Sequence, residues 1–145
     1  MRSSRMKAAL SLLPLMLLGC TAVDTPERTQ AAETRLTRAL DGLQAGTPQR
    51  CISRLRAYDL DIIDRRTVLF RSGRNLVYRA DFPGGCGSLD PTRILSYTTL
   101  TGGEICRGDI VRPVDRVTGS AVGGCAFSDF TPYVRPGSNA DPRGS

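Results

Sequence analysis

The 145-residue chain contains no histidine and no tryptophan, and its single lysine is Lys7. Without histidine, the chain lacks the commonest general base and the commonest side-chain ligand for metal ions. A serine or cysteine nucleophile would have no imidazole to activate it, and no later lysine could form a Schiff base. We therefore expect no enzyme activity, no cofactor and no metal site.

Long apolar runs are also missing, so the sequence predicts no membrane-spanning helix. One apolar stretch, residues 8–18, follows the basic residues Arg2, Arg5 and Lys7. A basic segment before an apolar stretch that is too short to span a membrane is typical of a secretory signal peptide. The chain is therefore expected to be exported.

The apolar stretch ends with Leu17-Leu18-Gly19-Cys20, which resembles the lipobox of bacterial lipoproteins. This resemblance implies that residues 1–19 are a signal peptide and that Cys20 carries acyl groups such as palmitate. Two or three acyl chains, at ~0.8 kcal/mol per buried methylene, give stable membrane attachment. Thr21, rather than Asp, indicates the outer membrane and a periplasmic face. An ordinary signal peptide that contains a cysteine and an uncleaved anchor are the alternatives.

Removal of residues 1–19 would take three of the 20 basic residues, leaving 17 against 14 acidic ones, a net charge of +3. All 17 are arginines. Guanidinium groups bind phosphate and carboxylate in a bidentate way, so clustered arginines could hold an anionic glycolipid or an envelope protein. A GC-rich coding bias is the alternative. Nucleic acid is not expected, because no aromatic residues are interleaved with the arginines. The candidate anion-binding patch, around one predicted hairpin, comprises Arg65, Arg66, Arg71, Arg74 and Arg79.

Lipidation of Cys20 would leave four cysteines in an oxidising compartment, which indicates two disulfides. Their gaps of 35, 20 and 19 residues, with no histidine, do not fit a metal site. Four cysteines allow three pairings. We favour Cys51–Cys125 with Cys86–Cys106, because Cys51 opens the first predicted strand and Cys125 opens the last. The inner pair would then close a hairpin-sized loop.

Residues 20–48 are interpreted as the lipidated cysteine, a tether and one amphipathic helix. The helix is predicted over residues 24–43, with Thr25 as its cap and an apolar stripe that includes Ala32 and Leu36. A helical spacer, a helix packed on the domain and a helix lying on the membrane all fit this thin stripe.

Residues 49–134 predict a mainly β domain. Short β-type segments alternate with turns rich in Gly and Pro, which is typical of a small antiparallel sheet of five to seven strands. We expect this sheet to curl into a barrel or a sandwich. Residues 76–82 alternate apolar and polar, so one face of that strand is predicted to be core and the other exposed. Residues 135–145 are predicted to be a disordered tail.

Three acids, Asp59, Asp61 and Asp64, precede Arg65 and Arg66. Their spacing does not fit a calcium loop, which needs closer oxygen ligands and a glycine. Paired carboxylates could serve glycoside hydrolysis, but few aromatic residues are present to line a sugar site. We interpret these acids as solvated groups that neighbouring arginines balance.

Several motifs together resemble a family of small bacterial lipoproteins with a four-cysteine β domain of no assigned function. The motifs are the lipobox, Cys51-Ile52, Cys106-x-Gly108-Asp109-Ile110 and Cys125-x-Phe127-x-x-Phe130-x-Pro132-Tyr133. The resemblance spans about residues 51–133. It implies no catalytic or binding residues.

These features together predict a lipid-anchored protein of the cell envelope that acts as a binding or scaffolding module. An inhibitor of an envelope-attacking enzyme and a carrier of a small apolar ligand are the alternatives. An apolar pocket would favour carriage, whereas an exposed apolar or arginine-lined edge would favour partner binding.

Mass spectrometry of the native protein tests the export prediction. We expect the chain to begin at an acylated Cys20, with the other four cysteines unreactive toward an alkylating reagent until a reductant is added. Two or more alkylated cysteines before reduction would contradict the disulfide prediction.

Overall fold

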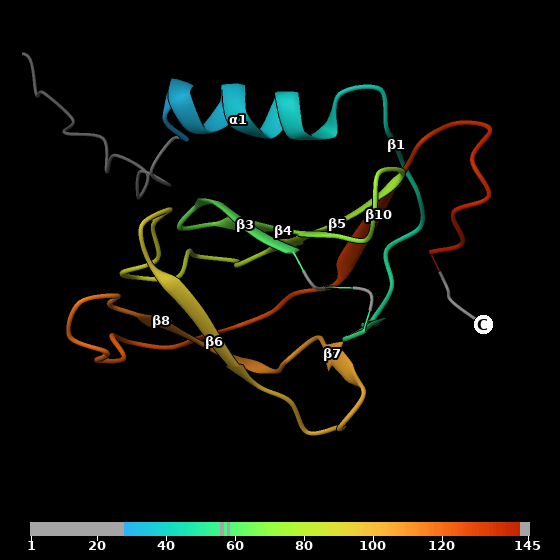
Figure 1. Cartoon of the computed structure of the whole chain (residues 1–145). Helices are drawn as coiled ribbons and strands as arrows, with labels where there is room; N and C mark the ends of the chain where they lie inside the picture. Colours follow the sequence, from blue (N-terminus) through green and yellow to red (C-terminus); the bar gives the residue numbers. More distant parts are fainter. Residues whose placement is uncertain (1–27, 56, 58, 143–145) are drawn as a thin grey trace, which may run out of the picture.

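The computed structural model describes residues 28–55, 57 and 59–142. The expected signal peptide, Cys20 and the end of the tail therefore lie outside the described residues. Within them the chain forms one helix and ten strands (Figure 1). The elements are α1 (Gln30–Leu40), β1 (Gln44–Ala45), β2 (Cys51–Ser53), β3 (Asp59–Asp64), β4 (Thr67–Arg71), β5 (Leu76–Asp81), β6 (Ile94–Thr98), β7 (Glu104–Cys106), β8 (Ile110–Val114), β9 (Cys125–Ala126) and β10 (Phe130–Val134).

The largest sheet has the strand order β1-β10-β5-β4-β3, with every pairing antiparallel. Its strand β4 is covered on both faces, since the residues from Thr67 to Phe70 are at most 1 % exposed. Side chains alternate along a strand, so Leu69 faces one hydrophobic cluster and Phe70 the other. A sheet that is buried on both faces needs a layer on each side.

Helix α1 supplies one of these layers by packing across the sheet (Figure 1). Thr29 caps it, since its side-chain oxygen accepts a hydrogen bond from the Ala32 backbone N–H at 3.3 Å. Ala32 and Leu36 are buried in one cluster with side chains of the sheet: Ile63, Leu69 and Val77. The amphipathic helix is thus part of the domain. It is shorter than the 24–43 range predicted, and the proposed cap Thr25 lies outside the described residues.

This packing corrects the expectation for residues 76–82. The alternation predicts Val77 on the exposed face of this strand, yet Val77 is buried. The reason is that α1 covers this face at Val77, so both faces are core there, whereas Arg79 and Asp81 on the same face stay partly exposed as predicted. A period-2 pattern cannot distinguish these cases when a helix from elsewhere in the chain covers the second face.

The other face of the sheet packs on two smaller sheets, β6-β8-β9 and β2-β7. In Figure 1 these strands lie below the five-stranded sheet. Phe127 lies at the centre of the layer between them, with ring centroids 5.4–5.7 Å from those of Phe70, Phe82 and Phe130. The architecture is therefore sandwich-like rather than a closed barrel. The prediction of a mainly β fold with one preceding helix and two disulfides is confirmed, but the described residues form ten strands in three sheets rather than one sheet of five to seven.

The predicted disulfide pairing is wrong. The two bonds join Cys51 to Cys106 and Cys86 to Cys125, not Cys51 to Cys125 and Cys86 to Cys106. β2 pairs with β7 in a register that sets Cys51 directly opposite Cys106. The second bond fastens the loop after β5 to β9. Strand register therefore decides the pairing, and cysteine order along the chain does not reveal it.

The domain boundaries also differ from those expected. β1 pairs with β10, so the sheet already includes residues 44 and 45. Residues 135–142, predicted as part of a disordered tail, return to the domain. The carbonyl oxygen of Pro142 accepts hydrogen bonds from the Tyr78 hydroxyl at 2.8 Å and from the Gln49 side-chain amide at 3.2 Å. Ala140 packs against the core.

Trypsin digestion without reduction tests the pairing, because cleavage at arginine places the four cysteines on four peptides: 51–54, 80–93, 94–107 and 117–143. We expect mass spectrometry to find 51–54 linked to 94–107, and 80–93 linked to 117–143. Peptide 51–54 linked to 117–143 would instead support the pairing predicted from sequence.

Replacing Cys86 and Cys125 together with Ser avoids leaving a lone thiol. We expect the free energy of unfolding, measured with urea under oxidising conditions, to fall by about 2–4 kcal/mol. The reason is that the unfolded chain, without this cross-link, has more conformational freedom. An unchanged unfolding midpoint would show that this bond does not stabilise the fold.

Candidate functional site

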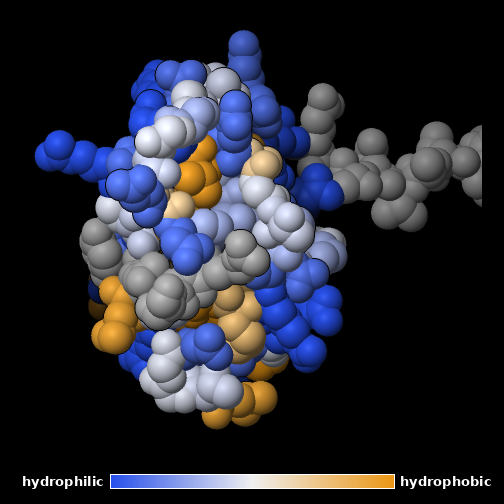
Figure 2. Space-filling view, turned by 90° about the vertical axis from the view of Figure 1, so that its right-hand side faces the viewer, coloured by the Kyte–Doolittle hydropathy of each residue, from blue (hydrophilic) through white to orange (hydrophobic). Residues whose placement is uncertain are grey.

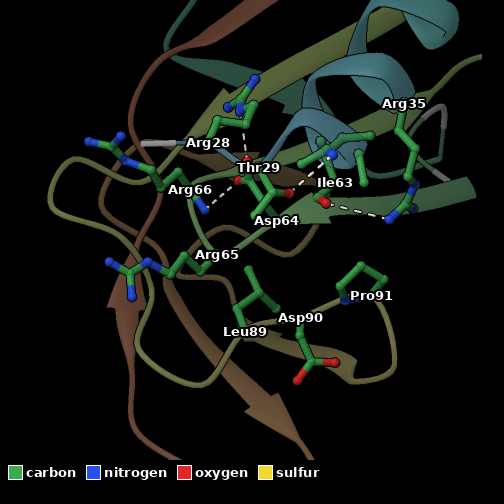
Figure 3. A pocket seen from close by; sticks show the side chains of 12 residues that line it. Arg28, Thr29, Arg35, Ile63, Asp64, Arg65, Arg66, Leu89, Asp90 and Pro91 are labelled. Carbon is green, nitrogen blue, oxygen red and sulfur yellow. Dashed lines mark hydrogen bonds and ion pairs between the residues drawn. The ribbon is translucent and has the colours of Figure 1, made fainter. Parts of the chain in front are cut away.

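A pocket of about 440 Å³ lies between the start of α1, the β3–β4 turn and the loop that follows β5 (Figure 3). Its apolar lining comes from the helix, the end of β3 and the loop: Ala31, Ala32, Ile63, Leu89 and Pro91. Its charged lining comprises four arginines and two aspartates: Arg28, Arg35, Arg65, Arg66, Asp64 and Asp90. The pocket therefore has an apolar part and a charged rim. Two further acids, Glu33 and Asp61, pair with Arg28 and Arg35 just outside this lining.

Asp64 fixes the turn at the edge of this pocket. One carboxylate oxygen accepts hydrogen bonds from the backbone N–H groups of Arg66 at 2.7 Å and Thr67 at 2.9 Å. The other oxygen forms an ion pair with Nε of Arg28 at 2.7 Å. This carboxylate therefore has a partner at each oxygen, and it neutralises Arg28. The turn is therefore stabilised by an aspartate side chain that accepts hydrogen bonds from the backbone two and three residues further along the chain.

A polar network runs from this ion pair under the helix. Arg28 also donates to the hydroxyl of Thr67, which is fully buried. That hydroxyl in turn donates to Asp81 at 2.6 Å, and Asp81 forms an ion pair with Arg79 at 2.9 Å. Partial burial alone would lower the pKa of Arg79, but the charge of Asp81 and its hydrogen bond outweigh that effect and raise the pKa.

Arg35 closes the other side of the pocket. Its guanidinium group binds Asp61 at 3.1 Å and the carbonyl oxygen of Ile62 at 3.1 Å. A second arginine, Arg71, lies 3.7 Å from the same carboxylate. Arg35 thus fastens α1 to β3, and its charge is offset within the domain.

Arg65 is left without such a partner. Its side chain is exposed, and no acid of the described chain lies within ion-pair distance of it. In Figure 3 the side chains of Arg65 and Arg66 extend toward the same side of the pocket, away from Leu89 and Pro91. Asp90 does not oppose this charge, because Thr92 and Arg93 bind its carboxylate. The hydrogen bond from the Thr92 hydroxyl, then that from its N–H, lowers the pKa of Asp90.

The predicted five-arginine patch is not a single surface. Arg65 and Arg66 precede β4, whereas Arg71 ends it and Arg74 follows in the next turn. The residues from 66 to 71 span about 17 Å along an extended strand, which puts the two groups at opposite ends of the sheet. Arg79 lies between them and is paired with Asp81. Only Arg65 and Arg66 reach the pocket.

The three predicted acids also have different environments. Arginines do pair with two of these acids: Arg35 and Arg71 with Asp61, and Arg28 with Asp64. These partners are not Arg65 and Arg66, which directly follow Asp64 in the sequence. Asp59 is exposed at the other end of β3. Sequence reasoning missed Arg28 and Arg35 as site residues. The two arginines are seven positions apart, about two helical turns, so they lie on one side of the predicted helix next to the apolar stripe at Ala32 and Leu36. This pattern could have indicated that they reach the domain.

Exposed large apolar side chains were the other feature expected to mark a partner surface. Among the described residues the most exposed are Leu55, Leu100 and Val117, at 89–94 %. On the face shown in Figure 2, hydrophobic side chains form separate patches between hydrophilic ones. The described residues contain no helix that is long and apolar enough to cross a membrane. Because the exposed apolar side chains on the face shown form separate patches, the pocket at α1 is the stronger candidate site.

Comparison with known proteins finds no family model, curated protein or solved structure that matches the chain. The resemblance to a family of small bacterial lipoproteins stays a prediction. The site has to be interpreted from its own residues.

Replacing Asp64 with Ala tests the network beneath the pocket. Two backbone N–H groups lose their acceptor and Arg28 loses its counter-charge, so we expect the free energy of unfolding to fall by about 2–3 kcal/mol. Asp59→Ala is the matched control, since Asp59 is exposed on the same strand. Urea unfolding at neutral pH compares the two variants, and equal stabilities would contradict the role given to Asp64.

Proposed function

We propose that the chain is a lipid-anchored protein of the cell envelope that acts as a binding module for an anionic ligand. The pocket beside α1 is the binding site. The observation that carries this proposal is the exposed guanidinium group of Arg65 at the edge of the pocket, with which no acid of the described residues pairs. The anchoring part of the proposal rests on the lipobox-like segment that ends at Cys20.

Three features support an anionic ligand over a cation or a neutral one. The acids at the pocket are already bound: Asp64 and Glu33 by Arg28, Asp61 by Arg35, and Asp90 by Thr92 and Arg93. The start of α1 adds the positive end of a helix dipole, equivalent to roughly half a charge. Guanidinium groups bind phosphate or carboxylate oxygens with two parallel hydrogen bonds.

The surrounding structure suits a site of this kind because it is held rigidly. Arg28 and Arg35 are tied to β3 and β4 by ion pairs and hydrogen bonds, and Cys86 in the adjoining loop is linked to Cys125. A preformed site loses less entropy when it binds a ligand. Carriage of an apolar ligand is a weaker proposal, since the pocket has a charged rim and Arg65 lies at its edge.

Titration with pyrophosphate tests anion binding, using the acylated chain in a nonionic detergent and isothermal calorimetry. We expect Arg65→Gln to weaken binding by about ten- to a hundredfold, since one charge-assisted hydrogen bond contributes about 1.5–3 kcal/mol. Arg74→Gln removes an equally exposed arginine from the turn at the other end of the sheet, and should bind as the native chain does. Equal affinities for the two variants would contradict the proposed site.

A further inference from the structure

The position of the pocket along the chain limits how far it can lie from a lipid anchor. Arg28, at the edge of the pocket, follows Cys20 by eight positions. Even a fully extended chain spans at most about 3.5 Å per residue, so the distance from the Cys20 Cα to that of Arg28 is at most about 28 Å. If the acyl chains on Cys20 are in the bilayer, the pocket edge cannot leave the neighbourhood of its surface.

The lining of the pocket fits the groups found at that surface. A lipid headgroup joins a phosphate to an apolar body, and the pocket joins arginines to an apolar lining. Of the apolar lining, the exposed side chains of Ala31 and Pro91 offer contacts for glycerol and the first methylenes, whereas Ile63 and Leu89 are almost fully buried. Arg65 offers a bidentate partner for phosphate. A free inorganic anion would use the arginines and leave the apolar part without a function.

The charge distribution supports the same orientation. Anionic lipids give the membrane surface a negative potential, which attracts each nearby arginine by about 1 kcal/mol. Arg65 and Arg66 sit in the turn that adjoins the start of α1, the same end of the domain at which the tether enters. The exposed leucines Leu55 and Leu100 belong instead to the loops around the β2–β7 ribbon.

We infer that the pocket binds the phosphate headgroup of an anionic lipid in the membrane to which the chain itself is anchored. This inference rests on the proposed function, both the acylation of Cys20 and anion binding at Arg65. The bound lipid adds a second, non-covalent attachment and fixes the orientation of the domain, so that the β3–β4 turn and the start of α1 face the membrane.

Nanodiscs that contain the acylated chain test the inference. Discs of phosphatidylcholine alone are compared with discs that also contain phosphatidylglycerol. A ligand that binds only the folded state stabilises it, so we expect phosphatidylglycerol to raise the midpoint of thermal unfolding by about 5 °C. Arg65→Gln should abolish this shift, and Arg74→Gln, with the same change in net charge, should keep it.

A longer tether separates a membrane lipid from a free anion. Inserting about twenty Gly and Ser residues after Val23 lengthens the tether from eight to about 28 residues, which lowers the effective concentration of the pocket at the membrane about sixfold. We expect a smaller midpoint shift in phosphatidylglycerol discs and unchanged pyrophosphate affinity in detergent.

The outcomes distinguish failure of this inference from failure of the proposed function. Pyrophosphate binding that needs Arg65, with no response to phosphatidylglycerol, would overturn the lipid inference and leave the anion site intact. Loss of both would overturn the proposed function. A shift that Arg65→Gln leaves unchanged would show general charge attraction and overturn the inference. A shift that a longer tether leaves undiminished would also overturn it.

Discussion

The fold depends on one constraint, the burial of both faces of the five-stranded sheet. β4 carries Thr67-Val68-Leu69-Phe70, and all four side chains are buried. A strand of this kind is stable only if a layer covers each face, because apolar side chains on either side must leave water. Helix α1 covers one face and the two smaller sheets cover the other. The pocket lies where the first layer begins, because the first turn of α1 meets the β3–β4 turn at that point.

Thr67, the buried polar side chain in β4, links the charged groups that lie next to the pocket. Thr67 is fully buried on the helix side of the sheet, so its hydroxyl needs partners there. Arg28 and Asp81 supply them, and each is itself ion-paired. Each charged group of this network has an oppositely charged partner, which offsets part of the cost of its burial. The network also fixes the position of the Asp64 turn, and hence of Arg65 and Arg66.

Sequence patterns predicted the parts of the fold that depend on local periodicity. The stripe at Ala32 and Leu36 found the buried side of the helix, and β-type segments with turns gave the mainly β class. What failed depends on register and on distant segments. Cys51 pairs with Cys106 because β2 and β7 are neighbours, which no spacing reveals. Five arginines close in sequence separate because an extended strand carries them apart. Arg28 and Arg35 joined the site from the predicted helix over residues 24–43, whose packing on the domain was only one of three alternatives.

The docking of residues 135–142 decides where the described chain ends relative to where it begins. Pro142 is bound at Gln49 and Tyr78, beside the start of the β2 segment, while the first described residue, Arg28, stands at the opposite end of α1 (Figure 1). The chain therefore enters and leaves the sandwich at distant points. A fluorophore attached to an exposed residue of this docked segment would therefore lie at the end of the sandwich remote from Arg65 and Arg66, and would leave access to them open.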